Sequence, residues 1–219
     1  YLDQISLSFI LNKKLINTAF RFNYMFKNFE TSKTEVIDIT KAWIVISAAF
    51  AIVLTKNNLV STQLLFNFLL SGLTVGIGFL FHELSHKVVA QKYGARAEFR
   101  AFNPMLLLAL AMSFFGFVFA APGAVMIAGG HINIKRNGKI SIAGPLVNLV
   151  LALIFFVVMK LNLSSGLNTI GQYGFFINSW LALFNMIPFG PFDGRKVFVW
   201  NKLFWISIVA IAVVFLFIL

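Results

Sequence analysis

The residues in this chain that are best suited to chemistry lie in segment 81–86, Phe-His-Glu-Leu-Ser-His. The surrounding run 74–90 is mostly apolar and contains no proline, which predicts a helix. His82 and His86 are four residues apart, so their imidazoles would share one helical face and could bind one zinc ion. Glu83 would lie beside that ion, where its carboxylate could take a proton from a metal-activated water. This spacing predicts the core of a zinc hydrolase with one zinc ion per chain.

The composition around this motif is that of a membrane protein. Of 219 residues, 59% are hydrophobic and only 11% are charged, which predicts an all-α polytopic membrane protein. Ionisable groups are costly to bury in a membrane helix, so the motif indicates a functional site rather than ordinary core histidines. The chain has no cysteine, which excludes disulfides, thiolate ligands and a cysteine nucleophile. Zinc would therefore be held by His, Asp or Glu.

The net charge of +11 is spread over loops between apolar runs instead of forming one basic face. This distribution indicates no nucleic-acid partner and favours anionic membrane lipids. Residues 1–40 are expected to form a basic amphipathic segment on the membrane surface, with a helix packed on its own protein as the alternative. An integral membrane domain is expected over 41–219, with its core at 62–200.

Apolar runs predict about five to six transmembrane helices. These runs occupy residues 42–55, 62–90, 105–121, 143–159, 167–187 and 203–219. The first reaches a full span only if residues 36–40 extend it.

The distribution of basic residues predicts which loops are cytoplasmic. The basic segments are 1–41, 91–100, 135–139 and 195–202, whereas 57–61 and 161–168 are not basic. Basic loops tend to stay inside, so the first group is assigned to the cytoplasm. The stretch 104–128 would then begin and end on the same side and is expected to be a re-entrant segment. The alternative is six simple crossings with one basic loop outside.

Two segments have the alternating pattern of β-strands. One is 94–102, and the other is 132–142, which alternates on both sides of the pair Asn137-Gly138. An Asn-Gly pair between alternating apolar residues predicts a two-residue hairpin. We therefore expect a small membrane-associated β-hairpin or sheet.

A catalytic zinc site usually has three protein ligands, so a third ligand must come from another segment. Asp193 follows a stretch broken by Pro188 and Pro191, and it could turn inward from irregular backbone at a depth similar to that of the histidines. Alternatively, it pairs with Arg195 at the membrane interface. On the charge-derived topology, both motifs approach the cytoplasmic side of the cell membrane.

Two further polar residues lie in apolar runs. Lys87 would have to extend its ammonium group to the membrane interface. Asn148 is interpreted as a hydrogen-bonding residue between helices.

Three segments of the chain form a specific series. They are His-Glu-x-x-His at 82–86, Ala-Gly-Pro-Leu-Val-Asn at 143–148, and Asn-x-x-Pro-x-x-x-x-Asp-Gly at 185–194. In this order they resemble the site-2 protease family of intramembrane zinc metalloproteases, over about 75–197. A second glycine often follows Asp-Gly in that family, whereas Arg195 stands here.

The resemblance implies that His82, His86 and Asp193 bind zinc and that Glu83 is the catalytic base. It also implies a role for Asn185, whose amide could hold the substrate backbone or the developing oxyanion. A hydrogen bond that packs helices is the alternative for this asparagine.

The function predicted for 41–219 is that of an intramembrane zinc endopeptidase. It would hydrolyse peptide bonds within or near the transmembrane helix of a single-span membrane-protein substrate. Strand edges at 95–101 and 130–142 could hold the unwound substrate extended. The competing functions are a membrane metal-ion transporter and a catalytically silent zinc-binding membrane protein. A transporter, however, does not need a glutamate directly after the first histidine, and the chain has no duplicated half. The sequence leaves the oligomeric state open.

Overall fold

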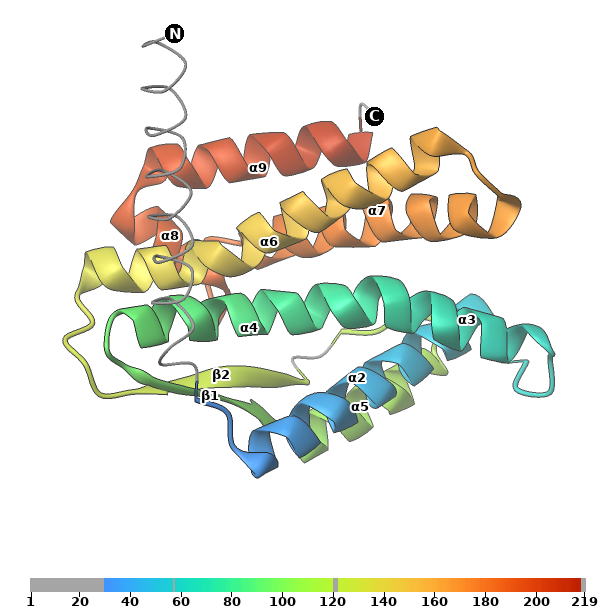
Figure 1. Ribbon diagram of the computed structural model, residues 1–219, viewed down its shortest axis with the longest axis horizontal. Coiled ribbons are helices and arrows are strands. Elements are labelled where there is room, and N and C mark those ends of the chain that lie inside the picture. The colour runs from blue at the N-terminus through green and yellow to red at the C-terminus, as the bar shows by residue number, and fades with distance from the viewer. Residues whose placement is uncertain (1–29, 57, 120–121, 218–219) are drawn as a thin grey trace, which may run out of the picture. The chain divides into compact units, whose positions relative to one another are not determined.

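The computed structural model describes residues 30–56, 58–119 and 122–217 (Figure 1). The chain divides into two units, residues 1–31 and residues 32–219. Nearly all described residues belong to the second unit. Most of the amphipathic segment predicted at 1–40 lies outside the described residues.

The described part of the chain is mainly helical and contains one small sheet, in agreement with the predicted class. The helices are α2 (Lys33–Leu54), α3 (Gln63–Ser71), the π-helical turn η1 (Gly72–Gly76), α4 (Ile77–Lys92), α5 (Asn103–Ser113), α6 (Ile134–Leu161), α7 (Ser165–Asn185), α8 (Asp193–Trp200) and α9 (Lys202–Phe217). The strands β1 (Arg96–Ala101) and β2 (Gly123–Ala128) are antiparallel.

Within the described residues, three helical segments are long and apolar enough to cross a membrane, as expected of a membrane protein. They are Lys33–Leu54, Gln63–Lys92 and Ile134–Leu161. The first is the run 42–55 extended toward its N-terminus, as the sequence required. The helices α5 and α9 are apolar but shorter. The total of five to six crossings stays a prediction, as does the re-entrant path of 104–128, which holds α5 and β2.

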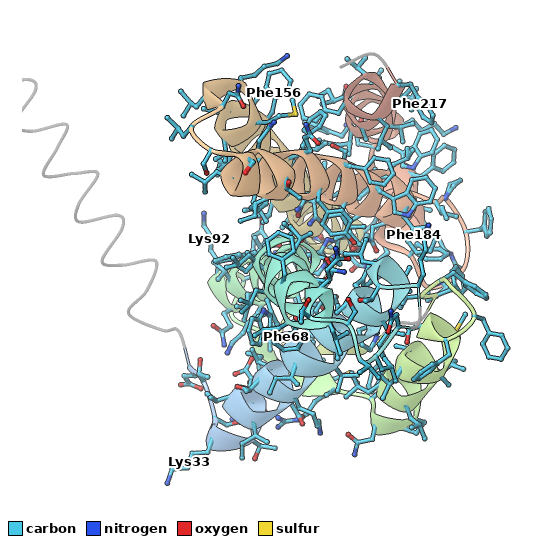
Figure 2. The ribbon with its side chains drawn as sticks, turned by 90° about the vertical axis from the view of Figure 1, so that its right-hand side faces the viewer. Lys33, Phe68, Lys92, Phe156, Phe184 and Phe217 are labelled. Atoms are coloured by element: carbon cyan, nitrogen blue, oxygen red, sulfur yellow. The ribbon has the colours of Figure 1, made fainter. Side chains whose placement is uncertain are left out.

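Consecutive long helices run in opposite directions and pack side by side (Figure 1). Helix α6 packs against both α4 and α7, and the β1–β2 sheet packs against α4. Apolar side chains project from the outer faces of the helices, including Phe217, which is 74% exposed and is labelled in Figure 2. On α6, Val150 and Leu153 are each more than half exposed. Such faces suit a hydrocarbon environment.

The β-hairpin predicted at 132–142 is wrong, because helix α6 begins there. Asn133 is its N-cap, and its side chain accepts a hydrogen bond from the Arg136 N–H at 2.9 Å. Gly138 lies inside the helix, where a Cβ atom would come within 2.4 Å of the Trp200 side chain. The Asn-Gly pair thus reflects close helix packing rather than a turn. The strand predicted at 94–102 is present as β1, but its partner is β2.

Candidate active site

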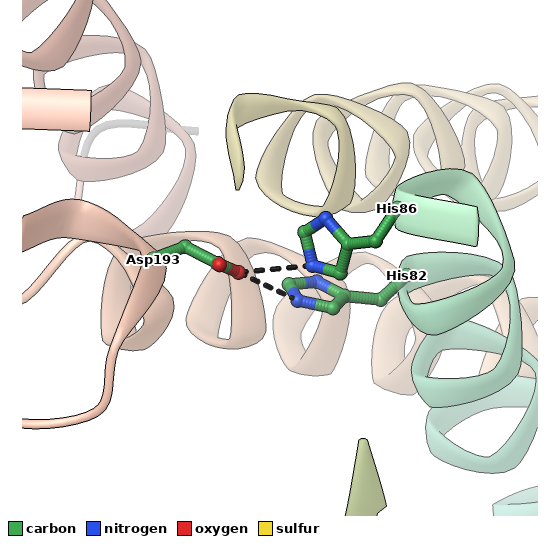
Figure 3. A group of neighbouring side chains, drawn as sticks. All are labelled: His82, His86 and Asp193. Atoms are coloured by element: carbon green, nitrogen blue, oxygen red, sulfur yellow. Dashed lines mark hydrogen bonds and ion pairs between the residues drawn. The ribbon is translucent and has the colours of Figure 1, made fainter. Parts of the chain in front are cut away.

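The side chains of His82, His86 and Asp193 converge between α4 and α8 (Figure 3). Oδ2 of Asp193 lies 3.2 Å from Nε2 of His82 and 3.0 Å from Nε2 of His86. All three residues are buried. The structure therefore brings together the three ligands predicted from the sequence, although the first and the last are 111 positions apart.

These three residues fit a zinc ion. Zinc bonds to imidazole nitrogen and carboxylate oxygen are about 2.0–2.2 Å long, so two donors on a tetrahedral ion lie roughly 3.3 Å apart. The observed separations are close to that value, and the ligand atoms all lie within 4.8 Å of one another. Two histidines and one carboxylate form a donor set typical of catalytic zinc.

Hydrogen bonds set the tautomer of both histidines. Nδ1 of His82 donates to Oδ1 of Asn148 at 2.6 Å, and Nδ1 of His86 donates to the carbonyl oxygen of Ile140 at 2.8 Å. Both acceptors are carbonyl oxygens, so each Nδ1 carries the proton. Each Nε2 is left with a lone pair directed at the metal position.

Asn148 does more than the interhelical hydrogen bonding predicted for it. Its Nδ2 donates to the carbonyl oxygen of Gly78 and to Oδ1 of Asn178, both at 3.1 Å. These two acceptors fix the amide orientation, so Oδ1 faces His82. Gly144, one turn earlier on α6, lies against the same ring, where a Cβ atom would come within 2.5 Å of Cε1. Segment 143–148 therefore positions His82, the first candidate ligand.

Asp193 is the first residue of α8, and the backbone around it explains the glycine that follows. A Cβ atom on Gly194 would lie 2.2 Å from the carbonyl carbon of Met186, so α8 can approach the end of α7 only with glycine there. A carboxylate binds a metal in its ionised form, and Oδ2 of Asp193 is the atom that faces Nε2 of both histidines.

Lys196 lies near Asp193, with its Nζ 3.7 Å from Oδ1. Arg195, the alternative partner considered from sequence, has an exposed side chain. A side chain at position 195 therefore has room, and the lack of a second glycine after Gly194 causes no steric conflict.

Glu83 and Asn185 both line the cavity beside the three candidate ligands. Oε2 of Glu83 accepts a hydrogen bond from the Val125 N–H of β2 at 3.0 Å. Nδ2 of Asn185 donates to the carbonyl oxygen of Leu181 at 2.9 Å, within its own helix. The structure thus places the predicted base at the site, and it places the asparagine amide in the cavity wall.

The cavity has a volume of about 420 Å³ and is mostly apolar. Helix α4 contributes one wall with Phe79 and Glu83, and strand β2 contributes another with Ala124 and Val125. The space adjoins the three candidate ligands and can hold a short peptide segment next to them.

Two known proteins resemble this chain over much of its length. A protein of Methanocaldococcus jannaschii named as a putative zinc metalloprotease is 43% identical over 179 residues, which cover 81% of this chain and 90% of the relative. A Bacillus subtilis protein, also named as a putative zinc metalloprotease, is 31% identical over 143 residues, covering 57% of this chain and 65% of the relative. No family model matches the chain, and no solved structure matches it significantly. The chain therefore belongs to the zinc metalloprotease family of these relatives, and zinc is its metal.

Proposed function

We propose that this protein is an intramembrane zinc endopeptidase of the site-2 protease type. Its substrates would be single-span membrane proteins, cut within or near the transmembrane helix. The observation that carries the proposal is the convergence of His82, His86 and Asp193 beside Glu83. The two histidines and Glu83 lie on the helical segment Gln63–Lys92, which is long and apolar enough to cross a membrane.

In this proposal His82, His86 and Asp193 hold the metal, and Glu83 is the general base. Bound zinc supplies a Lewis acid that lowers the pKa of water and polarises a carbonyl group. The carboxylate of Glu83 takes the proton of the attacking water and later delivers it to the leaving amine. An amide nitrogen has two hydrogens, so the bond from Asn185 to Leu181 leaves one for the substrate backbone or the oxyanion.

A helical substrate must unwind before its carbonyl groups become accessible, and β2 offers a place to hold it. One edge of β2 is bonded to β1, whereas the Val125 N–H on the other edge is directed toward Glu83. A substrate strand added along this outer edge would lie in the cavity next to the base. The strand edge proposed to hold the substrate is therefore that of residues 123–128, in place of the predicted 130–142.

The arrangement of the helices supports the proposed orientation in the cell membrane. The C-terminal end of α4, the N-terminal end of α6 and helix α8 lie together at the left of Figure 1. These ends carry or adjoin the basic segments, whereas the connections before α3 and after α6 lie at the opposite end. We infer a multi-pass protein whose active site lies toward the cytoplasm, near anionic lipid head groups.

The test uses purified, zinc-loaded protein in detergent with a panel of single-span model substrates. We expect mass spectrometry to show cuts within the spans by the wild-type protein, and none by a Glu83→Gln variant with equal zinc content. Failure of the wild-type protein to cut any substrate would contradict the proposal. Zinc flux into proteoliposomes that requires His82 but not Glu83 would indicate metal-ion transport instead.

A further inference from the structure

Glu35 of α2 and Lys87 of α4 form an ion pair whose side chains are both completely buried. Nζ of Lys87 lies 2.5 Å from Oε2 of Glu35. The sequence-based expectation that Lys87 reaches the membrane interface is therefore wrong. The partner on α2 provides the compensating charge, so the ammonium group can stay inside the protein.

Stability is a poor explanation for this pair. Removing two charges from water costs several kcal/mol per ion, and an apolar pair of similar volume is often as stable or more stable. Charged groups inside a membrane protein are rare and usually functional. Lys87 also directly follows His86 on α4, so the ion pair is attached to the helix that carries the two candidate histidine ligands.

The second carboxylate oxygen of Glu35 binds the sheet. Oε1 accepts a hydrogen bond from the Phe99 N–H of β1 at 2.9 Å. Phe99 lies directly opposite Val125 of β2, and the Val125 N–H donates to Glu83. Both N–H groups thus point away from the partner strand, as in a non-hydrogen-bonded antiparallel pair. The carboxylates of Glu35 and Glu83 therefore bind the two opposite edges of the sheet, at the cross-strand pair of Phe99 and Val125.

Helix α4 contributes to both of these attachments through one row of side chains. Phe79, Glu83 and Lys87 are spaced by four residues and so share a helical face. The ring of Phe79 packs edge to face on the ring of Phe99, with 5.9 Å between centroids. This row contacts the sheet, while His82 and His86 direct their rings toward Asp193 (Figure 3).

We propose that Glu35 and Lys87 are positioning residues of the active site. Their ion pair fixes the β1–β2 sheet against α4, so that the outer edge of β2 presents one substrate bond at the position of Glu83. The pair thereby selects which bond is cut. This inference rests on the proposed protease function.

The first test compares two double variants. Glu35→Leu with Lys87→Met removes both charges and the acceptor for the Phe99 N–H, whereas Glu35→Gln with Lys87→Gln keeps that acceptor and a neutral hydrogen bond. We expect both to retain zinc and a cooperative thermal transition. The apolar double variant should lose at least about tenfold in kcat/KM and cut neighbouring bonds as well, and the neutral one should fall between it and wild type.

The partly exposed ion pair between Glu98 and Arg100 provides a matched control, because it lies on the same strand β1 as Phe99 but is not enclosed like the Glu35–Lys87 pair. Neutralising it with glutamines should change neither the rate nor the cleavage site. If the apolar double variant cuts the wild-type bond with the wild-type kcat/KM, the positioning role is refuted.

A second measurement needs no substrate, and it separates this inference from the proposed function. Residue-resolved amide hydrogen exchange should show slow exchange of the Phe99 and Val125 N–H groups in the wild-type protein. In the Glu35→Leu, Lys87→Met variant, Phe99 should exchange faster because it has lost its acceptor. The Val125 N–H should also exchange faster. Once the sheet is no longer fixed against α4, the Glu83 carboxylate no longer lies where it accepts this hydrogen bond. Unchanged exchange at Val125 would refute the coupling, whether or not the protein cleaves any substrate.

Discussion

Gly144→Ala is the most direct test of how α6 holds the zinc site. The new Cβ atom would lie 2.5 Å from the His82 ring, whereas ordinary contacts begin at 3.4 Å, so the ring or the helix must move by about 0.9 Å. Zinc sites tolerate ligand displacements of only about 0.2 Å. The ring is also held by its bond to Asn148 and has little freedom to turn away.

We expect zinc affinity to fall by about 100-fold, the upper end of the effect of losing a partner that orients a ligand. This corresponds to about 2.7 kcal/mol. Competition with a chromogenic chelator in detergent measures the affinity directly. Gly166→Ala is the matched control, because a Cβ atom there meets no other atom within 4 Å. Wild-type affinity in Gly144→Ala, together with an unperturbed control, would refute the packing argument.

Further predictions concern the groups around the metal. Glu83→Gln should keep zinc but lose about 10²- to 10⁴-fold in cleavage rate, measured with a transmembrane substrate, since it removes the proposed general base. Asn148→Leu should lower zinc affinity about 10- to 100-fold in the same chelator assay, because His82 loses its acceptor. Gly194→Ala should reduce both zinc content and thermal stability, because the added atom would overlap the Met186 backbone. Chelation should abolish cleavage, and added zinc should restore it.

The sequence was sufficient for the candidate ligands but not for the sheet. His82 and His86 follow from their spacing in an apolar helix. Asp193 was a candidate because it follows a stretch broken by prolines, and the resemblance to the site-2 protease family implied it as the third ligand. Strand β2 was missed because Gly123–Ala128 is apolar throughout and lacks the alternation that marks a half-exposed strand. The hairpin error arose because a glycine needed for helix packing has the same sequence signature as one needed for a turn.

Partners far apart in sequence were also beyond prediction. The bond between Lys87 and Glu35 joins residues 52 positions apart, and nothing in the local pattern around either residue specifies the other. Asn148 could be recognised as a polar residue in an apolar helix, but only the fold shows that its acceptor faces His82. Tertiary packing decides such pairs.

The glycines at 138, 144 and 194 have a genetic consequence. At each one a neighbouring group occupies the space where a side chain would begin, and the distances to an added Cβ are 2.4, 2.5 and 2.2 Å. Every missense change of a glycine codon adds at least one carbon, so these positions have no conservative replacement. A saturation mutagenesis screen should therefore find some of its least tolerant positions at residues that have no side chain and take no part in the chemistry.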